Sequence, residues 1–320
     1  MSTRRSLILV ASVAALTMAA VAGLLARAPA APAATPALTA EIRFVDVGQG
    51  DGVVIRIGDK IIVSDTGEFR YPVLAKALND LKATRIDVLI LSHAHSDHAK
   101  NAAQLLREWK VGRVVMNRSL WWGGPATNKA VVDAIDDEPN ITRTYPVAGK
   151  KYDWGGAEWT FAHPRSGEFL SASSGAAGNS SLVYLLRVNG VTALFTGDIP
   201  ESVGNRLAEP LKQELGGDRL DIFLMTHHGA TTSSSDALDR AVRPRSVVIS
   251  AGAGNQWDHP LAAAVNRFKS IPVTRIWCTP ANGTVTAKIN AAGGVRWTSE
   301  KLANKPWWSG GVRRGLCNKI

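Results

Sequence analysis

Net charge is scarce in the central part of this 320-residue chain. Residues 1–40 contribute +3 and residues 296–320 contribute +5, so residues 41–295 hold only +2 of the formal charge of +10. Because the basic character lies at the two ends, the total charge does not by itself indicate a nucleic-acid-binding body. The 45% hydrophobic and 20% charged residues are ordinary globular values and argue against wholesale disorder.

Cysteine is also scarce, since Cys278 and Cys317 are the only two. A pair is consistent with an oxidising compartment and predicts one disulfide that pins the C-terminal tail to the domain. The alternative is two unrelated thiols, one of them buried.

Long apolar runs are limited to one, from Leu7 to Ala26, which follows Arg4 and Arg5 and precedes Ala-x-Ala sites. This pattern predicts an export signal or an N-terminal membrane anchor over residues 1–34, followed by a Pro/Ala linker at 35–40. The paired arginines fit either twin-arginine or ordinary Sec export. We expect an exported chain, periplasmic or extracellular, anchored through residues 7–26 if the signal is not cleaved. No bundle of membrane spans is expected after residue 26, so a channel formed by this chain alone is not expected.

From residue 41 onward the pattern predicts alternating strands and helices. Three strands are expected over 41–66, then a helix at 71–82, a buried strand at 85–92, a helix at 98–110 and a strand at 111–117. After a looser section, strands are expected at 157–164, 180–190 and 191–198, a helix at 201–215 and a strand at 220–229. A helix at 237–244, a strand at 246–252, a helix at 261–270 and a hairpin over 273–298 complete the pattern. It indicates an α/β fold with sheets inside, helices outside and polar residues at strand ends.

The stretch LSHAHSDHAKN, residues 91–101, predicts a metal site. In an extended chain His93 and His95 point to the same side and can bind one ion, while Asp97 and His98 enter the first turn of the next helix and suit a second ion. Imidazole and carboxylate groups are ligands for zinc, and also for manganese or iron. The alternative is a solvated polar loop.

Further ligands are expected at two later strand ends. Asp198, on the tight turn of LFTGD, is placed to bridge two metals. MTHHG offers His227 and His228, of which one is expected to face the site and the other to enter either the packing or the layer of residues around the ligands.

The glycines of GQGD, residues 48–51, form no nucleotide-binding loop. They lack the Lys-Ser/Thr of a P-loop and the length of a dinucleotide fingerprint. We expect instead a tight turn that places Gln49 and Asp51 near the metal rim. Ser92 and Ser180 are not expected to be nucleophiles, since neither has an obvious free base beside it.

Seven motifs in one order, FVDVGQGDGVVI, SDTG, LSHAHSDH, NSSLVYLL, LFTGD, THHG and ISAGAGNQWDHP, resemble the metallo-β-lactamase superfamily and, within it, the hydrolase domain of ComEC-type competence proteins. The resemblance implies a single-domain αββα four-layer sandwich over 41–298, with a basic, Trp-containing tail at 299–320. It also implies a two-metal site, with zinc favoured and manganese the alternative. The implied metal ligands are His93 and His95 for the first ion, Asp97, His98 and His228 for the second, with His227 less favoured, and Asp198 as the bridge. Asp65 is implied to orient ligands.

One departure from the family pattern concerns the first metal. The β-lactam- and lactone-hydrolysing members use a third histidine shortly before the bridging aspartate, but here the segment reads GNSSL and Asn179 stands in that place. Asparagine offers only a neutral amide oxygen. The departure disfavours antibiotic hydrolysis and favours the phosphodiester branch, with a looser first site. His163 could replace the missing ligand, or it could simply pair with backbone or substrate.

His259, in WDHP, follows the Gly-rich turn AGAGN, whose amides could cradle an anion. It is predicted to donate a proton to a leaving alkoxide or to steady a phosphate, with Asn255 beside it. Asp97 and His259 are therefore the predicted catalytic residues. Asp51, Asp65, Asn179, Asn255 and His163 are expected to contact the ligands or the substrate.

These observations predict an exported di-metal hydrolase in which a hydroxide held by the metals attacks a phosphodiester, with nucleic acid as the favoured substrate. Trp307 and Trp308 in the tail could stack bases, or they could cover a sheet edge or contact a membrane surface. The alternatives are a lactonase- or β-lactamase-like hydrolase, a phosphorylcholine-esterase-like envelope enzyme, and a non-catalytic DNA-binding component of a competence apparatus. Oligomeric state does not follow from the sequence.

Overall fold

The computed structural model of the chain describes residues 37–117, 126–168, 176–233, 235–273, 275–305, 308–309, 312–313 and 317. The expected signal or anchor over 1–34, the start of the linker, and Trp307 lie outside these residues. Within the described residues, no helix has both the length and the apolar character needed to cross a membrane.

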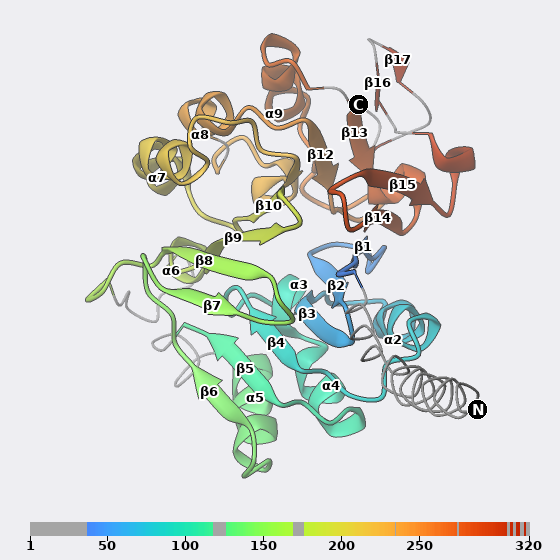
Figure 1. Ribbon diagram of the computed structural model, residues 1–320. Helices are drawn as coiled ribbons and strands as arrows, with labels where there is room; N and C mark the ends of the chain where they lie inside the picture. Colours follow the sequence, from blue (N-terminus) through green and yellow to red (C-terminus); the bar gives the residue numbers. More distant parts are fainter. Residues whose placement is uncertain are drawn as a thin grey trace, which may run out of the picture. The chain divides into compact units, whose positions relative to one another are not determined.

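Two sheets form the centre of the fold (Figure 1). The first has eight strands in the order β15-β14-β1-β2-β3-β4-β5-β6. Its antiparallel half comprises β15 (Val295–Ser299), β14 (Val285–Ile289), β1 (Ala40–Phe44), β2 (Gly52–Ile57) and β3 (Lys60–Thr66). Its parallel half continues from β3 to β4 (Val88–Leu91), β5 (Arg113–Met116) and β6 (Thr142–Thr144).

The second sheet has nine strands in the order β17-β16-β13-β12-β11-β10-β9-β8-β7. Its parallel strands are β10 (Val191–Phe195), β11 (Ile222–Leu224), β12 (Ser246–Ile249) and β13 (Arg275–Cys278). Antiparallel strands flank them, namely β7 (Lys151–Asp153), β8 (Glu158–His163) and β9 (Val183–Val188) at one side and β16 (Trp308–Ser309) and β17 (Val312–Arg313) at the other.

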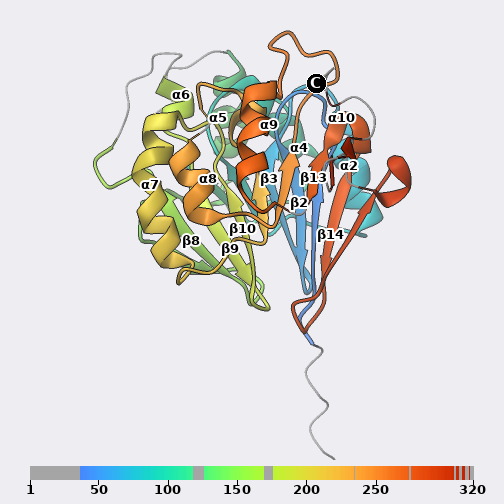
Figure 2. The same cartoon turned by 90° about the horizontal axis from the view of Figure 1, so that it is seen from above.

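The helices lie outside the sheets (Figure 2). The first sheet is covered by α2 (Tyr71–Asp80), α3 (Ser96–Ala99), α4 (Ala102–Glu108) and α5 (Ala126–Asp136), and the second by α7 (Glu201–Glu214), α8 (Asp236–Val242) and α9 (Ala262–Arg267). Shorter elements are α6 (Ala176–Asn179), α10 (Thr279–Asn282), η1 (Thr226–Gly229), η2 (Phe268–Ser270) and η3 (Leu302–Asn304).

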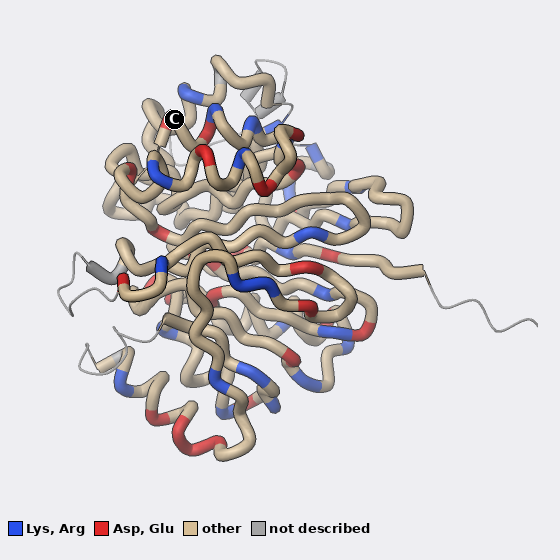
Figure 3. The backbone as a smooth tube through the Cα atoms, turned by 60° about the vertical axis from the view of Figure 1, so that its left-hand side comes forward, with Lys and Arg blue, Asp and Glu red and all other residues tan. Residues whose placement is uncertain are grey.

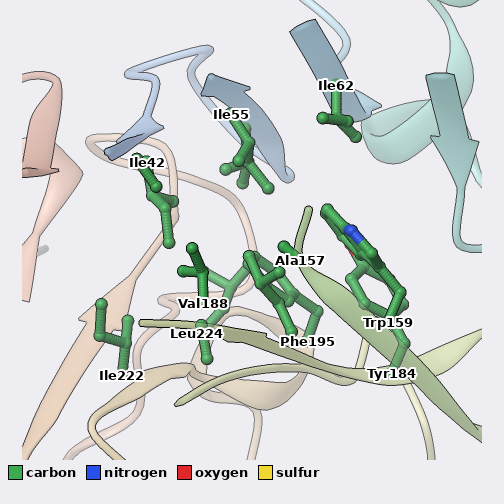
Figure 4. Packing of buried hydrophobic residues seen from close by; sticks show 14 of the residues in the cluster. Ile42, Ile55, Ile62, Ala157, Trp159, Tyr184, Val188, Phe195, Ile222 and Leu224 are labelled. Atoms are coloured by element: carbon green, nitrogen blue, oxygen red, sulfur yellow. The ribbon is translucent and has the colours of Figure 1, made fainter. Parts of the chain in front are cut away.

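Three buried clusters hold these layers together. The middle cluster lies between the sheets, where Ile42, Ile55 and Ile62 of the first sheet face Tyr184 and Phe195 of the second (Figure 4). The other two pack each sheet against its own helices. Strands β4, β10 and β12 are buried along their whole length. This explains their nearly continuous apolar sequences, since strands covered on both faces have no solvent-facing side. The arrangement confirms the αββα four-layer sandwich.

The polar motifs lie where the parallel strands end. Asp65 is at the end of β3, His93 follows β4, Asp198 follows β10 and His228 follows β11. Since neighbouring parallel strands end at the same sheet edge, residues far apart in sequence meet there. The predicted clustering at strand ends is confirmed.

Two predicted elements are wrong. Segment 273–298 is not one hairpin, because β13 belongs to the second sheet and only β14 and β15 pair as a hairpin in the first. The short helix α10 lies between them, with Pro280 in its first turn. Gly283, with φ +66°, follows the helix and lets the chain change sheets. The looser section before residue 157 contains helix α5 and the strands β6 and β7.

The C-terminal segment continues the packing beyond residue 298. The Asn282 amide donates to Lys305 O, and Glu300 accepts from Thr284 N at 2.9 Å. Farther on, β16 adds to the second sheet beside β13. The predicted disulfide joins Cys278 to Cys317, both fully buried, with Cα atoms 6.0 Å apart.

Charged residues are interleaved over the side of the domain shown in Figure 3, where blue and red segments alternate along the outer elements. This is consistent with the small net charge of residues 41–295. No basic face stands out on this side of the described domain.

Candidate metal centre

The segment after β4 positions the first group of site residues. The chain stays extended through His95, which has ψ 150°, and helix α3 begins at Ser96. As predicted, this places Asp97 and His98 in the first helical turn. His93, His98 and Asp198 are buried, whereas the side chain of His95 is 38% exposed and borders a cavity.

Four side chains converge as one candidate ligand set, which we call the inner set: Asp97, His98, Asp198 and His228. His98 Nε2 lies 3.2 Å from both His228 Nε2 and Asp198 Oδ1. His228 Nε2 is 3.3 Å from Asp97 Oδ2 and 3.6 Å from Asp198 Oδ1. Two nitrogens and two carboxylate oxygens in so small a space form a donor set suited to zinc or manganese.

The hydrogen bonds of the two imidazoles show why this set requires a cation. His98 Nδ1 donates to Asp65 Oδ2 at 2.9 Å, and His228 Nδ1 donates to Ser250 O at 2.9 Å. Each ring therefore keeps a proton on Nδ1 and turns its Nε2 toward the other ring. Two Nε2 atoms 3.2 Å apart are compatible only if a positive charge, a proton or a metal ion, lies between them. The residues fit a bound metal ion.

A second candidate set, the outer set, consists of His93, His95 and Asp198. His93 Nε2 is 2.9 Å from His95 Nδ1 and 3.5 Å from Asp198 Oδ2. The Ser92 hydroxyl is 3.0 Å from His93 Nδ1 and orients that ring. The two sets share Asp198, which presents Oδ1 to the inner set and Oδ2 to the outer one. This is the arrangement expected of a bridging carboxylate.

Two buried carboxylate oxygens without hydrogen-bond partners also fit the binding of cations. Asp198 Oδ1 and Asp51 Oδ1 are buried and lack hydrogen-bond partners among the described residues. Gly50, with φ +105°, allows the turn that carries Asp51 to reach helix α3, because a Cβ there would lie 1.7 Å from Asp97 O. The predicted tight turn thus places Asp51 against the inner set, 3.4 Å from His228 Nδ1.

Protonation in the cage follows from the same contacts. Burial alone would lower the pKa of His228, but Asp198 and the neighbouring carboxylates raise it to about 10. Burial also acts to lower the pKa of His98, but the charges of Asp198 and Asp65 outweigh it and hold this pKa well above its usual value. Burial lowers the pKa of His93 to about 4, with the charge of His98 acting in the same direction. The inner set thus attracts positive charge strongly, and protons must leave when a metal binds.

The two histidines after β11 take different places. His228 enters the inner set, whereas His227 lies beside the ligands: its Nε2 is 3.5 Å from Asp198 Oδ2, and it borders the cavity. Both residues adopt left-handed backbone conformations, with φ 48° and 55°. Strand alternation therefore does not apply, and both rings reach the same aspartate from different sides.

The cavity in front of the outer set has a volume of about 310 Å³. It is lined by Gln49, His95, Asp97, Asp198, His227 and His259, with Trp257 in its wall. Burial, followed by the charges of His228 and His227, lowers the pKa of His259 to about 4. His259 Nδ1 is buried and lacks a hydrogen-bond partner among the described residues.

Asn255 fixes the loop that carries His259. Its Nδ2 donates to Gly252 O and to His259 O, at 2.8 and 2.6 Å. Its Oδ1 accepts from Trp257 N and from His259 N, at 3.1 and 3.0 Å. Both ends of the amide are engaged within the loop, and the result is a fixed position for His259.

His163 does not replace the third histidine of the first metal. His163 Nε2 donates to the backbone oxygen of Asn179 at 2.8 Å, and its Nδ1 faces Glu168 and Arg206, both at 3.5 Å. Asn179 ends α6, just before β9. Among the described His, Cys, Asp and Glu residues, the outer set therefore has three members and the inner set four.

Two serines orient the ligands and were missed as functional residues. Ser92 donates from both its backbone N and its hydroxyl to the Asp65 carboxylate, each at 2.7 Å. The Ser181 hydroxyl donates to Gly178 O and accepts from Asp198 N at 3.0 Å. Their place beside the motifs LSHAHSDH and NSSLVYLL was the available signal, but a serine pattern does not reveal which backbone it will reach.

Comparisons with known proteins agree with this geometry. The family model of the metallo-beta-lactamase superfamily matches residues 45–253. Competence protein ComA of Neisseria gonorrhoeae is 27% identical over 242 residues, which cover 75% of this chain and 31% of that protein. ComE operon protein 3 of Bacillus subtilis (strain 168) is 26% identical over 264 residues, covering 77% of this chain and 32% of that protein. The chain thus spans about a third of the length of these relatives.

Among solved structures, the metallo-beta-lactamase fold protein YhfI from Bacillus subtilis aligns with a TM-score of 0.50 and 12% identity, covering 78% of this chain and 99% of that one. This likeness shows the fold alone. The family match extends over more than half of the chain and includes the segments that carry both ligand sets. The chain belongs to the metallo-β-lactamase superfamily, in the branch of the ComEC-type competence proteins.

Proposed function

We propose that this chain is an exported two-metal phosphodiesterase whose favoured substrate is nucleic acid. The observation that supports it most is the inequality of the two ligand sets, with three members in the outer set and four in the inner. In members that hydrolyse lactams and lactones a third histidine completes the first metal, and here Asn179 stands at that position. A phosphodiester has two non-bridging oxygens that share one negative charge, so it can supply the ligand that the outer set lacks.

The inner set, Asp97, His98, Asp198 and His228, would hold one divalent cation, and His93 and His95 would hold the other with Asp198 as the bridge. Two cations there would lower the pKa of water and neutralise charge that develops on the phosphoryl oxygens. Asp65 fixes the His98 ring with Nε2 facing the cage, since its carboxylate binds the Nδ1 proton.

His259 is assigned to the leaving oxygen. Its ring borders the cavity, and the Asn255 amide holds its backbone in place. With a pKa of about 4 it is neutral at pH 7 in the free site. An anionic phosphodiester beside the ring raises that pKa, so the ring can receive a proton and pass it to the departing alkoxide.

Purified protein, supplied with zinc, manganese or no metal, tests the proposal. We expect metal-dependent cleavage of single-stranded DNA and of bis(p-nitrophenyl) phosphate, and none of a lactone or a cephalosporin. Asp198→Ala should abolish cleavage, whereas His163→Gln, a change to a buried histidine outside both sets, should retain it. Cleavage of the lactone or the cephalosporin alone would refute the proposal.

The role of His259 has a separate test. A leaving group that needs no proton, such as p-nitrophenolate, should depart almost as fast from His259→Ala as from the parent. A leaving alkoxide, as in DNA, should depart about 10²- to 10⁴-fold more slowly, which is the usual contribution of general acid–base catalysis. Equal losses on both substrates would remove His259 from this role.

A further inference from the structure

Two large hydrophobic side chains are exposed in the described part of the chain: Phe69, at 64%, and Trp257, at 48%. Single exposed apolar residues are common on protein surfaces and carry no meaning by number alone. Their location is what matters, because both belong to loops at the edge that carries the metal centre.

Trp257 forms part of the wall of the cavity beside the outer set. Its ring lies nearly parallel to that of His259, with centroids 6.3 Å apart and an interplanar angle of 22°. The backbone N–H groups of both residues donate to the same Asn255 oxygen. The backbone that carries the indole is therefore fixed next to that of His259, the group assigned to the leaving oxygen.

Phe69 lies on the other side of the turn that carries Gln49. A Cβ built on Gly48 would be 3.8 Å from Phe69 Cβ, so the ring begins beside this turn. On the opposite side, Gln49 Oε1 accepts from Gly252 N at 3.0 Å, at the start of the loop that carries Trp257. The turn thus lies between the two aromatic residues, and its Gln49 lines the cavity.

A cation accompanies Phe69. The Lys100 ammonium lies 5.3 Å from the centre of the ring and 3.0 Å from Glu68 Oε1. An exposed ring with an ammonium group beside it can contact a base and its phosphate together. Such a pairing does not suit an aliphatic headgroup, which has no planar face to stack.

We propose that Trp257 and Phe69 are specificity-determining residues that select phosphodiesters flanked by unpaired planar rings, one on each side of the scissile bond. This inference rests on the proposed phosphodiesterase function. Bases within a duplex stack on one another, so the two protein rings can be used only by a single strand.

The test compares two esters with the same leaving group, thymidine 5′-(p-nitrophenyl phosphate) and methyl p-nitrophenyl phosphate. The parent should prefer the nucleoside ester in kcat/KM. The nucleoside is the non-leaving group of this ester, so it lies on the side away from Trp257. Phe69→Ala and Phe69→Leu should lose about 5- to 150-fold of that preference through KM, the range that base stacking covers. Phe69→Tyr, which keeps a planar ring, should retain most of it.

Trp257→Ala should change the two small esters alike, because they share one leaving group, and should lower kcat/KM on a single-stranded tetranucleotide by a similar factor. An abasic residue on the leaving side of the cleaved bond should produce the same loss in the parent, and no further loss in the variant. Unchanged zinc affinity would show that the variants fold and that their centres are intact.

The outcomes separate the two proposals. If the parent cleaves both esters but Phe69→Ala keeps the full nucleoside preference and Trp257→Ala cleaves the tetranucleotide as fast as the parent, the stacking inference is overturned and the phosphodiesterase stands. If the parent cleaves neither ester in the presence of zinc or manganese, both proposals fall together.

Discussion

Replacing Asp65 by asparagine should weaken metal binding without removing a ligand. The Asp65 carboxylate accepts three hydrogen bonds: Oδ1 accepts from Ser92 N at 2.7 Å, and Oδ2 accepts from the Ser92 hydroxyl at 2.7 Å and from His98 Nδ1 at 2.9 Å. An amide of the same shape can keep only one accepting oxygen. Whichever way it is turned, its NH2 group faces either the Ser92 N–H or the His98 ring.

If the NH2 group faces His98, the ring must accept on Nδ1 and carry its proton on Nε2, the atom that points into the inner set. If it faces Ser92 N, two donors meet in a buried place, which costs about 1–3 kcal/mol. Loss of such an orienting partner typically lowers metal affinity about 10- to 100-fold. That corresponds to about 1.4–2.7 kcal/mol of binding free energy.

The affinity for zinc can be measured by titration against a competing chelator, alongside the free energy of unfolding. Asp239→Asn is the matched control, because Asp239 is also a buried carboxylate but pairs with Arg267 in the outer helix layer, at 3.0 Å. The control should keep its metal affinity. An Asp65→Asn protein that binds zinc as tightly as the parent would refute the assigned orienting role.

Three further predictions concern other parts of the domain. Gly50→Ala should displace Asp97 and abolish tight metal binding, whereas Gly149→Ala, at an equally left-handed glycine with φ +85° and open space around it, should affect only stability; zinc titration of both variants decides. Cys278→Ser opens a disulfide spanning 39 residues and should lower the free energy of unfolding by about 4 kcal/mol relative to the oxidised parent, as measured by urea denaturation, and the reduced parent should show a similar loss. Burial raises the pKa of Asp239 from 3.8 to about 6 despite a neighbouring guanidinium. Its contribution to stability is therefore greatest below about pH 4 and falls by roughly 3 kcal/mol as the pH rises through 6. Replacement by asparagine should remove this slope, and a parent and variant that show the same pH dependence would contradict the assignment.

Local patterns were enough to predict most of the layers and the chemistry of the centre. Alternating and continuous apolar runs marked the strands, and the spacing of His93, His95, Asp97 and His98 anticipated two neighbouring sets. These features depend on residues close in sequence, whose geometry follows from strand and helix periodicity. The path of the chain after Cys278 was not predictable in this way, because which sheet β14 joins is decided by its long-range pairing with β1.

The two serines that orient the ligands were equally unpredictable from the sequence. Ser92 and Ser181 act through hydrogen bonds to Asp65 and to the Asp198 backbone, and nothing local distinguishes such serines from others. The exact place of His227 was not predictable for a related reason. A strand pattern implies alternation, but left-handed backbone at both residues of the pair directs each ring toward Asp198.

The unequal support of the two sets implies an order of metal binding. In the inner set, His98 and His228 are fully buried and each is fixed through Nδ1, by Asp65 and by Ser250 O. In the outer set the His95 side chain is 38% exposed and borders the cavity. Ligands that are already fixed lose less conformational entropy when a metal binds, so the inner set should fill first and more tightly.

The outer metal would then bind with a substrate oxygen rather than before it, since that set has the fewer protein ligands and faces the cavity beside Trp257 and His259. Zinc titration should therefore show one tight site in the free protein. A second site should tighten when a non-hydrolysable phosphorothioate dinucleotide is added, because by linkage each ligand strengthens the other to the same degree. Two equal sites in the free protein, unaffected by the dinucleotide, would show that the missing histidine has no consequence for the outer metal.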